Sequence, residues 1–495
     1  MAKAEKDCCV LTLRLNPEAW QVDLIEKRFK IMEHLKNSLI ALELRRLKNA
    51  QRTRAYKDLI TKIENANGTE RKKLYTERSK LLRDAGFSEF GFINDMTSMQ
   101  KHFVEHMAAQ VAHRSASDVW RAFEKMLYGN GKIVHFIRRG TLDSIACKKI
   151  GNGMNLRNDY FEWNGGRCKN QIALSIKVEK PKTVYEKEML NKKIKYLRIV
   201  RKWSKTKYKY YLQIIFEGNP ATKARYIEYG KRVGIDIGTS TVAIVSEQEV
   251  KLLELADQVK KNQDKKTSLQ QKMDKSKRIS NMDNFNADGT IKRGKRLKWN
   301  YSKNYLKLQQ QVRELERKNA AIRKYQHICL ANYVLSQGTE VYVETMSFSG
   351  LQRRSKETTY DFRGRINKKR RFGKSLGNRA PAMFLEILDK KLKHIANTEL
   401  HKVDTQKFKA SQYNHITGTY EKKTLKDRWA KLGNGEKVQR DLYSAFLLMN
   451  SATDMEKTDQ KLCEKTYIRF KELHDDEINR IMKDGKKHIR SFGIA

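Results

Sequence analysis

Three acidic residues are spaced as the ligands of a metal-dependent hydrolytic site would be. Asp236 lies in an apolar stretch with glycines on both sides, Glu344 ends a second apolar stretch 108 positions later, and Asp441 begins a helical pattern 97 positions further on. Hydrolysis of a phosphodiester by in-line attack uses two Mg²⁺ ions held by carboxylate oxygens from several rigid elements. Taken singly, each acid is equally well explained as a turn residue, a solvated strand end or a favourable charge at a helix N-terminus. Their combination favours a site for phosphodiester hydrolysis.

The elements that would position these acids follow from the hydrophobic pattern. Residues 232–246 predict a strand, a glycine turn and a second strand, residues 339–346 predict another strand, and residues 439–449 predict a helix. Between the first two stretches we expect two long amphipathic helices joined by a polar loop at 281–300. The first helix covers 250–273, and the second carries Tyr305, Leu308, Val312, Leu315, Ile322 and Tyr325.

The N-terminal part of the chain has two regions that differ in the spacing of their apolar residues. An apolar run at 10–15 is followed by apolar residues at steps of three and four up to about residue 128, which predicts one strand and then a helical block. From 129 to 217 the period changes to two, as in Ile133, His135 and Ile137, and glycine and Asn-Gly pairs separate the runs. This region is therefore expected to form the hairpins of a small barrel or sheet.

The charge balance indicates a polyanionic partner. The 495 residues include 104 Lys and Arg against 57 Asp and Glu, a formal net charge of +47. Such a surplus destabilises a compact fold by self-repulsion unless a polyanion shares the surface, so nucleic acid is the expected partner. Apolar runs stay far below the roughly 20 residues that a bilayer needs, and the N-terminus does not resemble a secretion signal. The six cysteines form no C-x-x-C pair, which indicates free thiols in a cytoplasmic protein that binds no membrane.

Basic residues concentrate first between positions 192 and 209. Nine Lys and Arg residues occur there with no acid, interleaved with tyrosines and a tryptophan. Cations for phosphates and aromatic faces for bases are what a nucleic-acid groove needs, although a solvated edge hairpin would have the same composition. The expected contacts are Lys195, Arg198, Arg201, Lys202, Trp203, Lys205 and Lys207.

A second basic stretch, 351–375, closely follows Glu344. It has ten Lys and Arg residues against two acids, contains Gly364 and Gly373, and directly follows Gly350. We expect a mobile lid or a strand-guiding loop that controls access to the metals, with a merely solvated segment as the alternative. The expected nucleic-acid contacts are Arg353, Arg354, Arg363, Arg365, Lys368, Arg370 and Arg371, together with Arg440 beside the third acid.

Around the three acids the sequence resembles the TnpB nucleases of transposons and the compact type V CRISPR effectors derived from them. The first motif of that family, an Asp in G-x-D-x-G, is matched by residues 234–238. The second, a Glu after an apolar strand, is matched by Glu344, and the third, Arg-Asp before a helix, is matched by Arg440 and Asp441. The resemblance covers at least residues 208–449.

The resemblance implies a multidomain α+β protein. Its parts would be a RuvC-like nuclease domain of ribonuclease-H fold, a β-barrel wedge domain and a helical recognition domain. The expected boundaries are 1–20 and 129–217 for the wedge, 21–128 for the helical domain, 218–231 for a linker, 232–408 and 438–495 for the nuclease with a helical insertion at about 250–335, and 409–437 for a zinc-ribbon insert.

The resemblance also implies a reaction and its partners. A guide RNA would pair with one strand of target double-stranded DNA, while the wedge and helical domains hold the RNA and read a short flanking motif. Asp236, Glu344 and Asp441 would ligate two Mg²⁺ ions, which Mn²⁺ can replace, and Arg440 would contact a phosphate or support the motif. A monomer is favoured, with a dimer on one RNA as the alternative.

The sequence departs from the family at the zinc ribbon. The frame S-Q-x-C-x-x-C-G is kept from Ser411 to Gly418, but both of its cysteines are replaced. The four thiolate positions of the ribbon hold Asn414, Thr417, Lys431 and Asn434. Without thiolates a tetrahedral zinc site is not expected, so we predict a metal-free remnant.

Three other functions fit parts of the pattern. Residues 234–240 also resemble the first phosphate motif of actin-like ATPases, but the sequence has no second Asp-x-Gly-Gly turn, and +47 does not suit a small-molecule kinase. An unguided RuvC-like nuclease or resolvase would recognise DNA structure directly and need no RNA. A guided DNA-binding protein with an inactive site would bind without cutting, which the intact triad disfavours.

Overall fold

The computed structural model describes residues 7–204, 207–221, 227–292, 294, 297–355, 357–360, 364, 372–421, 427–484 and 492–494. The chain divides into two compact units, Met1–Thr222 and Lys223–Ala495. The division falls within the segment 218–231 that the sequence predicts to be a linker. The finer domain boundaries expected from the sequence stay predictions.

The first unit contains an antiparallel sheet in the order β1-β7-β6-β2. Its strands are β1 (Cys8–Leu15), β7 (Lys207–Glu217), β6 (Ile194–Ser204) and β2 (Ser144–Ala146). Alternate residues of β1 are buried, because one face of the sheet packs into the core of the unit. The predicted strand at 10–15 and the predicted basic hairpin are therefore confirmed.

A second sheet of this unit has the order β3-β4-β5. It consists of β3 (Met154–Arg157), β4 (Tyr160–Trp163) and β5 (Ser175–Lys177), and the short helix α6 (Val184–Leu190) follows it. The two sheets meet at the end of β1, where Leu15 bridges Val178. Both strand orders are open, so closure into a barrel stays a prediction.

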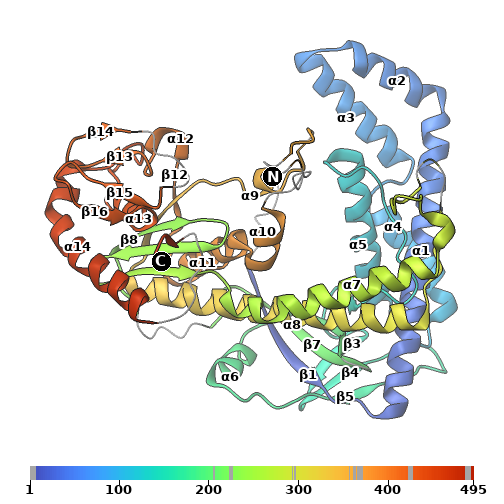
Figure 1. Cartoon of the computed structure of the whole chain (residues 1–495). Coiled ribbons are helices and arrows are strands. Elements are labelled where there is room, and N and C mark those ends of the chain that lie inside the picture. The colour runs from blue at the N-terminus through green and yellow to red at the C-terminus, as the bar shows by residue number, and fades with distance from the viewer. Residues whose placement is uncertain are drawn as a thin grey trace. The chain divides into compact units, whose positions relative to one another are not determined.

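Helices make up nearly all of the sequence from Ala19 to Tyr128, as the pattern predicts (Figure 1). They are α1 (Ala19–Arg52), α2 (Arg54–Asn65), α3 (Gly68–Asp84), α4 (Glu89–Gln100), the 3₁₀ turn η1 (Lys101–Phe103) and α5 (Ala109–Tyr128). Phe29 of α1, Phe92 of α4 and Phe123 of α5 share one core with Leu212 of β7. The long helices and the first sheet therefore fold as one body.

The strand expected at Ile133, His135 and Ile137 is wrong. These residues form no strand, and the side-chain amide of Asn37 on α1 bonds both the N–H and the C=O of Ile137, at 2.8 and 2.9 Å. Gly140 likewise donates its N–H to the carboxylate of Glu33 at 2.8 Å. Side chains of one helix thus satisfy backbone groups that a neighbouring strand would otherwise pair.

A buried acid of α1 makes the stability of the first unit depend on pH. Glu43 is fully buried and shares Arg46 with Asp95 of α4, whose carboxylate accepts from the guanidinium at 2.7 Å. Burial, followed by a hydrogen bond with Asp95, raises the pKa of Glu43 from 4.5 to about 8. Glu43 is therefore protonated in the folded protein at neutral pH.

We expect this group to lower the free energy of unfolding as pH rises from 4.5 to about 8, by up to about 1.4 kcal/mol per pH unit. Stability falls because the folded state retains a proton that the unfolded state has released in that range. Glu43→Gln keeps the protonated shape, so its advantage over the wild type grows with pH. Urea unfolding at acidic and alkaline pH measures the difference. Glu64→Gln, exposed on α2, is the control, and an advantage independent of pH would contradict the prediction.

The second unit holds a five-stranded sheet in the order β10-β9-β8-β11-β12. Its strands are β8 (Arg232–Ile237), β9 (Thr241–Ser246), β10 (Val250–Glu254), β11 (Glu340–Glu344) and β12 (His401–Val403). The neighbours β8, β11 and β12 are parallel, and β9 runs antiparallel to β8 and β10. The strands predicted at 232–246 and 339–346 are confirmed, and β8 lies at the centre.

Helices cover both faces of this sheet (Figure 1). On one face α8 (Lys303–Gln337) and α11 (Pro381–Ile395) share a core with β8, and on the other α13 (Arg440–Met449) and α14 (Gln460–Lys483) share a core with β9 and β10. The other helices are η2 (Asp257–Asn262), α7 (Gln263–Ile279), η3 (Met282–Asn284), α9 (Phe348–Leu351), α10 (Gly373–Arg379) and α12 (Thr405–Phe408). None of the helices that the structure describes is both long and apolar enough to cross a membrane.

The helix expected from Val250 begins later than predicted. Residues 250–254 form the edge strand β10, and α7 starts only at Gln263. Val250 and Leu252 face the core beside α14, whereas Leu253 faces the core beside α8. Apolar residues one and two positions apart, as in this segment, are compatible with a strand and with part of a helix. The segment forms a strand because it pairs with β9. The other two predicted helices are confirmed as α8 and α13.

Candidate active site

Asp236 and Glu344 lie side by side at the carboxyl ends of two parallel strands. The pairing of β8 with β11 sets Val343 opposite Ile235, so Glu344 is level with Asp236. Parallel strands bring their carboxyl ends to one edge of a sheet, where the sites of open α/β sheets are found. Sheet pairing thus joins two acids that are 108 positions apart in the sequence.

Gly234 allows α13 to bring the third acid to the same place. A Cβ on Gly234 would overlap the carbonyl oxygen of Ala445 and lie 2.5 Å from the amide nitrogen of Met449, so this approach of strand and helix requires glycine. Two strand residues separate Gly234 from Asp236, about 6.7 Å. Four helix residues separate Ala445 from Asp441, about 6 Å. Contact of Gly234 with Ala445 therefore sets Asp441 opposite Asp236.

The three acids line one cavity of about 450 Å³. The structure thus brings together the predicted acids and the predicted Arg440. Hydroxyl, amide and guanidinium groups make up most of the remaining wall, which suits an anionic ligand. The other lining residues are Gly238, Thr239, Ser240, Thr241, Met346, Ser411, Gln412, Arg428 and Ser444.

Burial and mutual repulsion raise the pKa values of two of the acids. Burial, followed by the charges of Asp441 and Glu344, raises the pKa of Asp236 well above its usual value, and the charge of Arg440 opposes this. Burial also raises the pKa of Glu344, against a hydrogen bond from the backbone N–H of Ala410. A divalent cation among these carboxylates would relieve the repulsion and stabilise their ionised forms.

The donor set fits hard divalent cations, since Mg²⁺ prefers carboxylate oxygens. Over the described residues, no three Asp, Glu, His or Cys side chains are grouped tightly enough to hold one metal ion in common. A pair of ions does not require such a group, because substrate phosphate and water complete the coordination of each ion. Asp236, with Glu344 on the neighbouring strand and Asp441 on the facing helix, would provide carboxylate ligands of this kind.

Arg440 orients the third acid from the rim of the cavity. Its Nε and Nη2 atoms each lie 3.4 Å from Oδ1 of Asp441, and Nη1 donates to the carbonyl of Asp427 at 3.0 Å. The backbone N–H of Arg440 donates to the carbonyl of Arg428. Arg440 thus links α13 to the chain segment before it, and Arg428 brings a second guanidinium to the cavity.

Several cavity residues were not predicted from the sequence. Gln412 and Arg428 come from the predicted ribbon insert, Thr239 and Ser240 come from the turn after β8, and Ser444 lies one turn after Asp441. The Ser-Gln frame and the Gly-Thr-Ser turn are visible in the sequence. Nothing in the sequence distinguishes Arg428 from the other basic residues, and only the fold shows that these groups share a wall.

The predicted ribbon insert folds as two short hairpins. The first pairs β13 (Tyr413–Asn414) with β14 (Thr419–Tyr420), and the second pairs β15 (Trp429–Lys431) with β16 (Lys437–Gln439). Of the residues at the thiolate positions, Asn414 is buried and accepts from the N–H of Ile416, whereas Thr417, Lys431 and Asn434 are exposed. The absence of zinc stays a prediction.

The predicted nucleic-acid contacts on the basic hairpin β6–β7 differ in their exposure to solvent. Trp203 is 38% exposed and packs edge-on against Tyr208, with ring centroids 4.9 Å apart. Of the others, Lys202 and Lys207 are exposed, Lys195 and Arg198 are half-buried, and Lys205 lies outside the described residues.

Arg201, one of the predicted nucleic-acid contacts, is buried and bonded within its own unit. Its side chain is 4% exposed, forms an ion pair with Glu26, and donates to the carbonyls of Leu142 at 3.0 Å and Gly140 at 3.2 Å. The guanidinium is thus committed to interactions within the unit. A lysine or arginine in a basic run is predicted to be solvated, and the run does not reveal which member is ion-paired in the core.

The structure describes the two ends of the second basic stretch, 351–375. Arg353 and Arg354 follow α9 and are exposed. At the other end Ser375 of α10 donates to the carbonyl of Thr239, which lines the cavity, at 2.9 Å. The stretch therefore leaves the sheet after β11 and returns to the turn after β8. The predicted contacts that lie outside the described residues are Arg363, Arg365, Lys368, Arg370 and Arg371.

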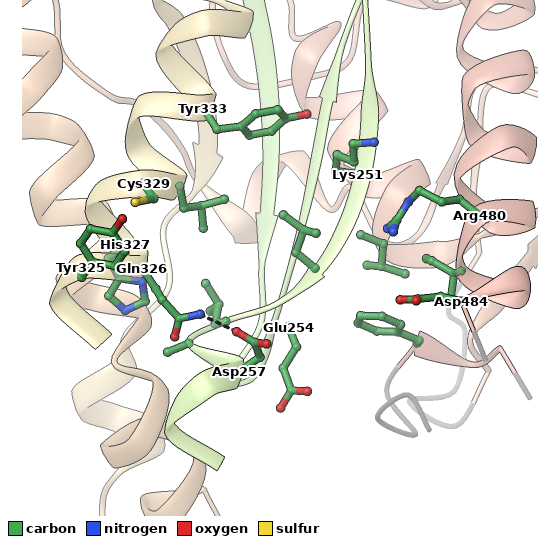
Figure 2. Close-up of a pocket in the computed structure, with 17 residues that line it drawn as sticks. Lys251, Glu254, Asp257, Tyr325, Gln326, His327, Cys329, Tyr333, Arg480 and Asp484 are labelled. Atoms are coloured by element: carbon green, nitrogen blue, oxygen red, sulfur yellow. Dashed lines mark hydrogen bonds between the residues drawn. The ribbon is translucent and has the colours of Figure 1, made fainter. Parts of the chain in front are cut away.

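A second cavity of the same unit, about 590 Å³, lies at the edge strand β10 between α8 and α14 (Figure 2). Most of its polar side chains have partners within the protein. Gln326 donates to Asp257 at 2.5 Å, and Lys251 and Arg480 both form ion pairs with the buried Glu477. The three acids do not line this cavity, so it is separate from the candidate active site.

Comparisons with known proteins found no matching family model and no matching curated protein. Among solved structures, the chain is similar to a Cas12f1–sgRNA–target DNA complex solved by cryo-EM, with 12% identity and a TM-score of 0.45 over 90% of this chain and 99% of that chain. It is also similar to a CRISPR-Cas12f ternary complex, with 13% identity and a TM-score of 0.28 over 87% and 82% of the two chains. These neighbours are compact type V CRISPR effectors, the kind of protein that the sequence resembles at its three acidic motifs.

Proposed function

We propose that the chain is an RNA-guided DNA endonuclease that cuts in the single cavity lined by Asp236, Glu344 and Asp441. The observation that carries this proposal is the meeting of the three acids, one from each of three sequence motifs, in that cavity. Two independent features bring them there: the register of β8 with β11, and the contact of Gly234 with α13. Acids with merely local roles in a turn, a strand end and a helix start have no reason to converge.

The cavity has the groups that phosphodiester hydrolysis needs. Two Mg²⁺ ions, which Mn²⁺ can replace, would activate the attacking water and stabilise the leaving oxygen. Asp236, Glu344 and Asp441 would hold these ions. Arg440 orients Asp441, and Arg428 adds positive charge where a non-bridging phosphate oxygen would lie.

Guidance by RNA is supported by the sequence resemblance and by the net charge of +47. In this proposal the first unit, with its basic hairpin β6–β7, holds the guide RNA and reads a short flanking motif on double-stranded DNA. Exposed Lys202, Lys207 and Trp203 provide cations and an aromatic face for that RNA. Pairing of the guide with one DNA strand provides the sequence specificity.

Sequencing of the RNA that co-purifies with the protein tests the guided part of this proposal. We expect one discrete RNA with a variable segment, and Mg²⁺-dependent cleavage only of DNA that matches this segment and carries the flanking motif. Random cellular RNA, with cleavage of branched or unmatched DNA, would indicate an unguided nuclease instead. Guided binding without cleavage products would indicate a DNA-binding protein.

A further inference from the structure

The two hairpins of the insert are fastened by a cluster of aromatic and histidine side chains. In a zinc ribbon, four ligands from two hairpins converge on one ion. Here the corresponding positions carry no thiolate, so the hairpins need another source of cohesion. Two- and three-residue strands are too short to be stable alone.

The first hairpin is fastened to α13 through His415, which is 1% exposed. Its backbone N–H donates to the hydroxyl oxygen of Tyr443 at 3.0 Å, and its Nδ1 lies 2.6 Å from the same oxygen. The hydroxyl has one proton of its own, which it donates to Nδ1 in the tautomer with the ring proton on Nε2. Burial lowers the pKa of His415 to about 4, which keeps the ring in the neutral form that this bond requires.

The second hairpin is fastened to α14 and to the C-terminal segment. The backbone N–H of Gln439 donates to Nε2 of His474, which is also 1% exposed, at 2.9 Å. The indole N–H of Trp429 donates to the carbonyl of Gly493 at 2.9 Å. Each hairpin thus has a buried histidine in its attachment.

The two hairpins also contact each other. A Cβ on Gly433 would come within 2.6 Å of Cγ2 of Thr417, so the turns of the hairpins touch. Tyr467 of α14 contacts both: its ring centroid lies 4.7 Å from that of His415, and its hydroxyl donates to Glu436 at 2.5 Å. Packing and hydrogen bonds therefore provide the link that a metal ion provides in a ribbon.

This fastening controls one wall of the cavity. Gln412 immediately precedes β13, Arg428 immediately precedes β15, and both line the cavity with the three acids. Ala410, two residues before Gln412, donates its N–H to Glu344. A hairpin that moved away from α13 would take Gln412 with it.

We propose that His415 is a positioning residue for cleavage: its two hydrogen bonds to Tyr443 replace a zinc ion as the fastening of the first hairpin and hold Gln412 at the cavity wall. The positioning role rests on the proposed nuclease function. The attachment of the first hairpin to α13 does not rest on that function, because it is a property of the protein in the absence of nucleic acid.

Hydrogen exchange on the full-length chain tests the fastening without any activity. We expect amides of residues 413–420 to exchange at least about tenfold faster in His415→Phe, which keeps an aromatic ring but removes Nδ1. His415→Asn, whose amide can bond the Tyr443 hydroxyl, should recover part of the protection. His327→Phe is the matched control, since His327 is equally buried but bonds Arg379 on the other face of the sheet. The wild type should contain no stoichiometric zinc by mass spectrometry.

Cleavage by the RNA-loaded protein tests the positioning role. We expect kcat to fall about tenfold in His415→Phe and in Tyr443→Phe, with KM for DNA unchanged. The double variant should be no slower than the slower single one, because both substitutions remove the same side-chain bond between Nδ1 of His415 and the Tyr443 hydroxyl. His327→Phe should keep the wild-type kcat.

The outcomes separate this inference from the proposed function. Stoichiometric zinc, or hairpin exchange unchanged in His415→Phe, would overturn the fastening. Faster exchange with equal kcat in all variants would overturn the positioning role. Faster exchange in a protein whose wild type cuts no guided DNA would support the fastening and overturn the nuclease function.

Discussion

Replacement of Asp236 by asparagine is expected to lower Mg²⁺-dependent cleavage at least about a thousandfold while raising the stability of the second unit. In the proposed function, activity falls because an amide lacks the negative charge with which the carboxylate would hold a divalent cation. Stability rises because burial and the charges of Asp441 and Glu344 raise the pKa of Asp236. Above pH 3.8, the usual pKa of an aspartate, the unfolded wild type releases this proton, whereas the folded wild type must keep it or hold a buried charge that its neighbours repel. The folded state of the wild type is therefore destabilised at these pH values, and asparagine, which does not ionise, removes this effect.

Guided cleavage and denaturant unfolding of the same two proteins measure both effects. The stability gain of Asp236→Asn should be present near pH 8 and shrink toward pH 4, where the unfolded carboxyl also begins to bind its proton. Binding of RNA should not change. Asp257→Asn, in the second cavity, should cut at the wild-type rate. Cleavage by Asp236→Asn at that rate would remove Asp236 from the site.

Replacement of Gly234 by alanine should destabilise the second unit by about 3 kcal/mol or more, at the upper end for an overpacked core. The added methyl group would overlap backbone atoms of Ala445 and Met449, and a backbone cannot rotate away as a side chain can. Strand β8 and helix α13 must therefore separate. Because this contact sets Asp441 opposite Asp236, cleavage should fall even where the variant remains folded.

Thermal and denaturant unfolding of the full chain measure the loss of stability. Gly377→Ala is the matched control, since a Cβ at this position in α10 meets nothing within 4 Å. It should leave stability unchanged or raise it by up to about 1 kcal/mol, because alanine favours the helix. Equal stability of Gly234→Ala and the wild type would show that α13 does not approach β8 as closely as described.

Much of the site could be predicted from the sequence because its acids end strongly patterned elements. β8, β11 and α13 were each predicted from local hydrophobic period, and each carries its acid at one end. The pattern could not predict the spacing between the elements. That spacing depends on Gly234, which lies against the backbone of α13. A close backbone contact of this kind leaves no repeating hydrophobic pattern in the sequence.

The features that the sequence did not predict depend on partners distant in the chain. β10 is a strand because β9 pairs with it, and Arg201 forms an ion pair with Glu26 in the interior of its unit. Asn37 bonds the backbone of Ile137, in the segment 133–137 that forms no strand. Gln412 and Arg428 reach the cavity because two short hairpins dock on α13 and α14. In each case the local pattern is compatible with two structures, and a contact with residues distant in the sequence determines which of them forms.

Helix α13 is buried on every side from Leu442 to Met449. A helix of ten residues with such a composition is not stable alone in water and must fold together with the sheet and α14. During synthesis, Asp441 follows Glu344 by 97 residues, about 5 to 20 seconds at ordinary rates of translation. A chain still growing on the ribosome thus has two acids in place and lacks the third. The order of the motifs along the polypeptide therefore delays assembly of the three-acid cavity until α13 has been synthesised.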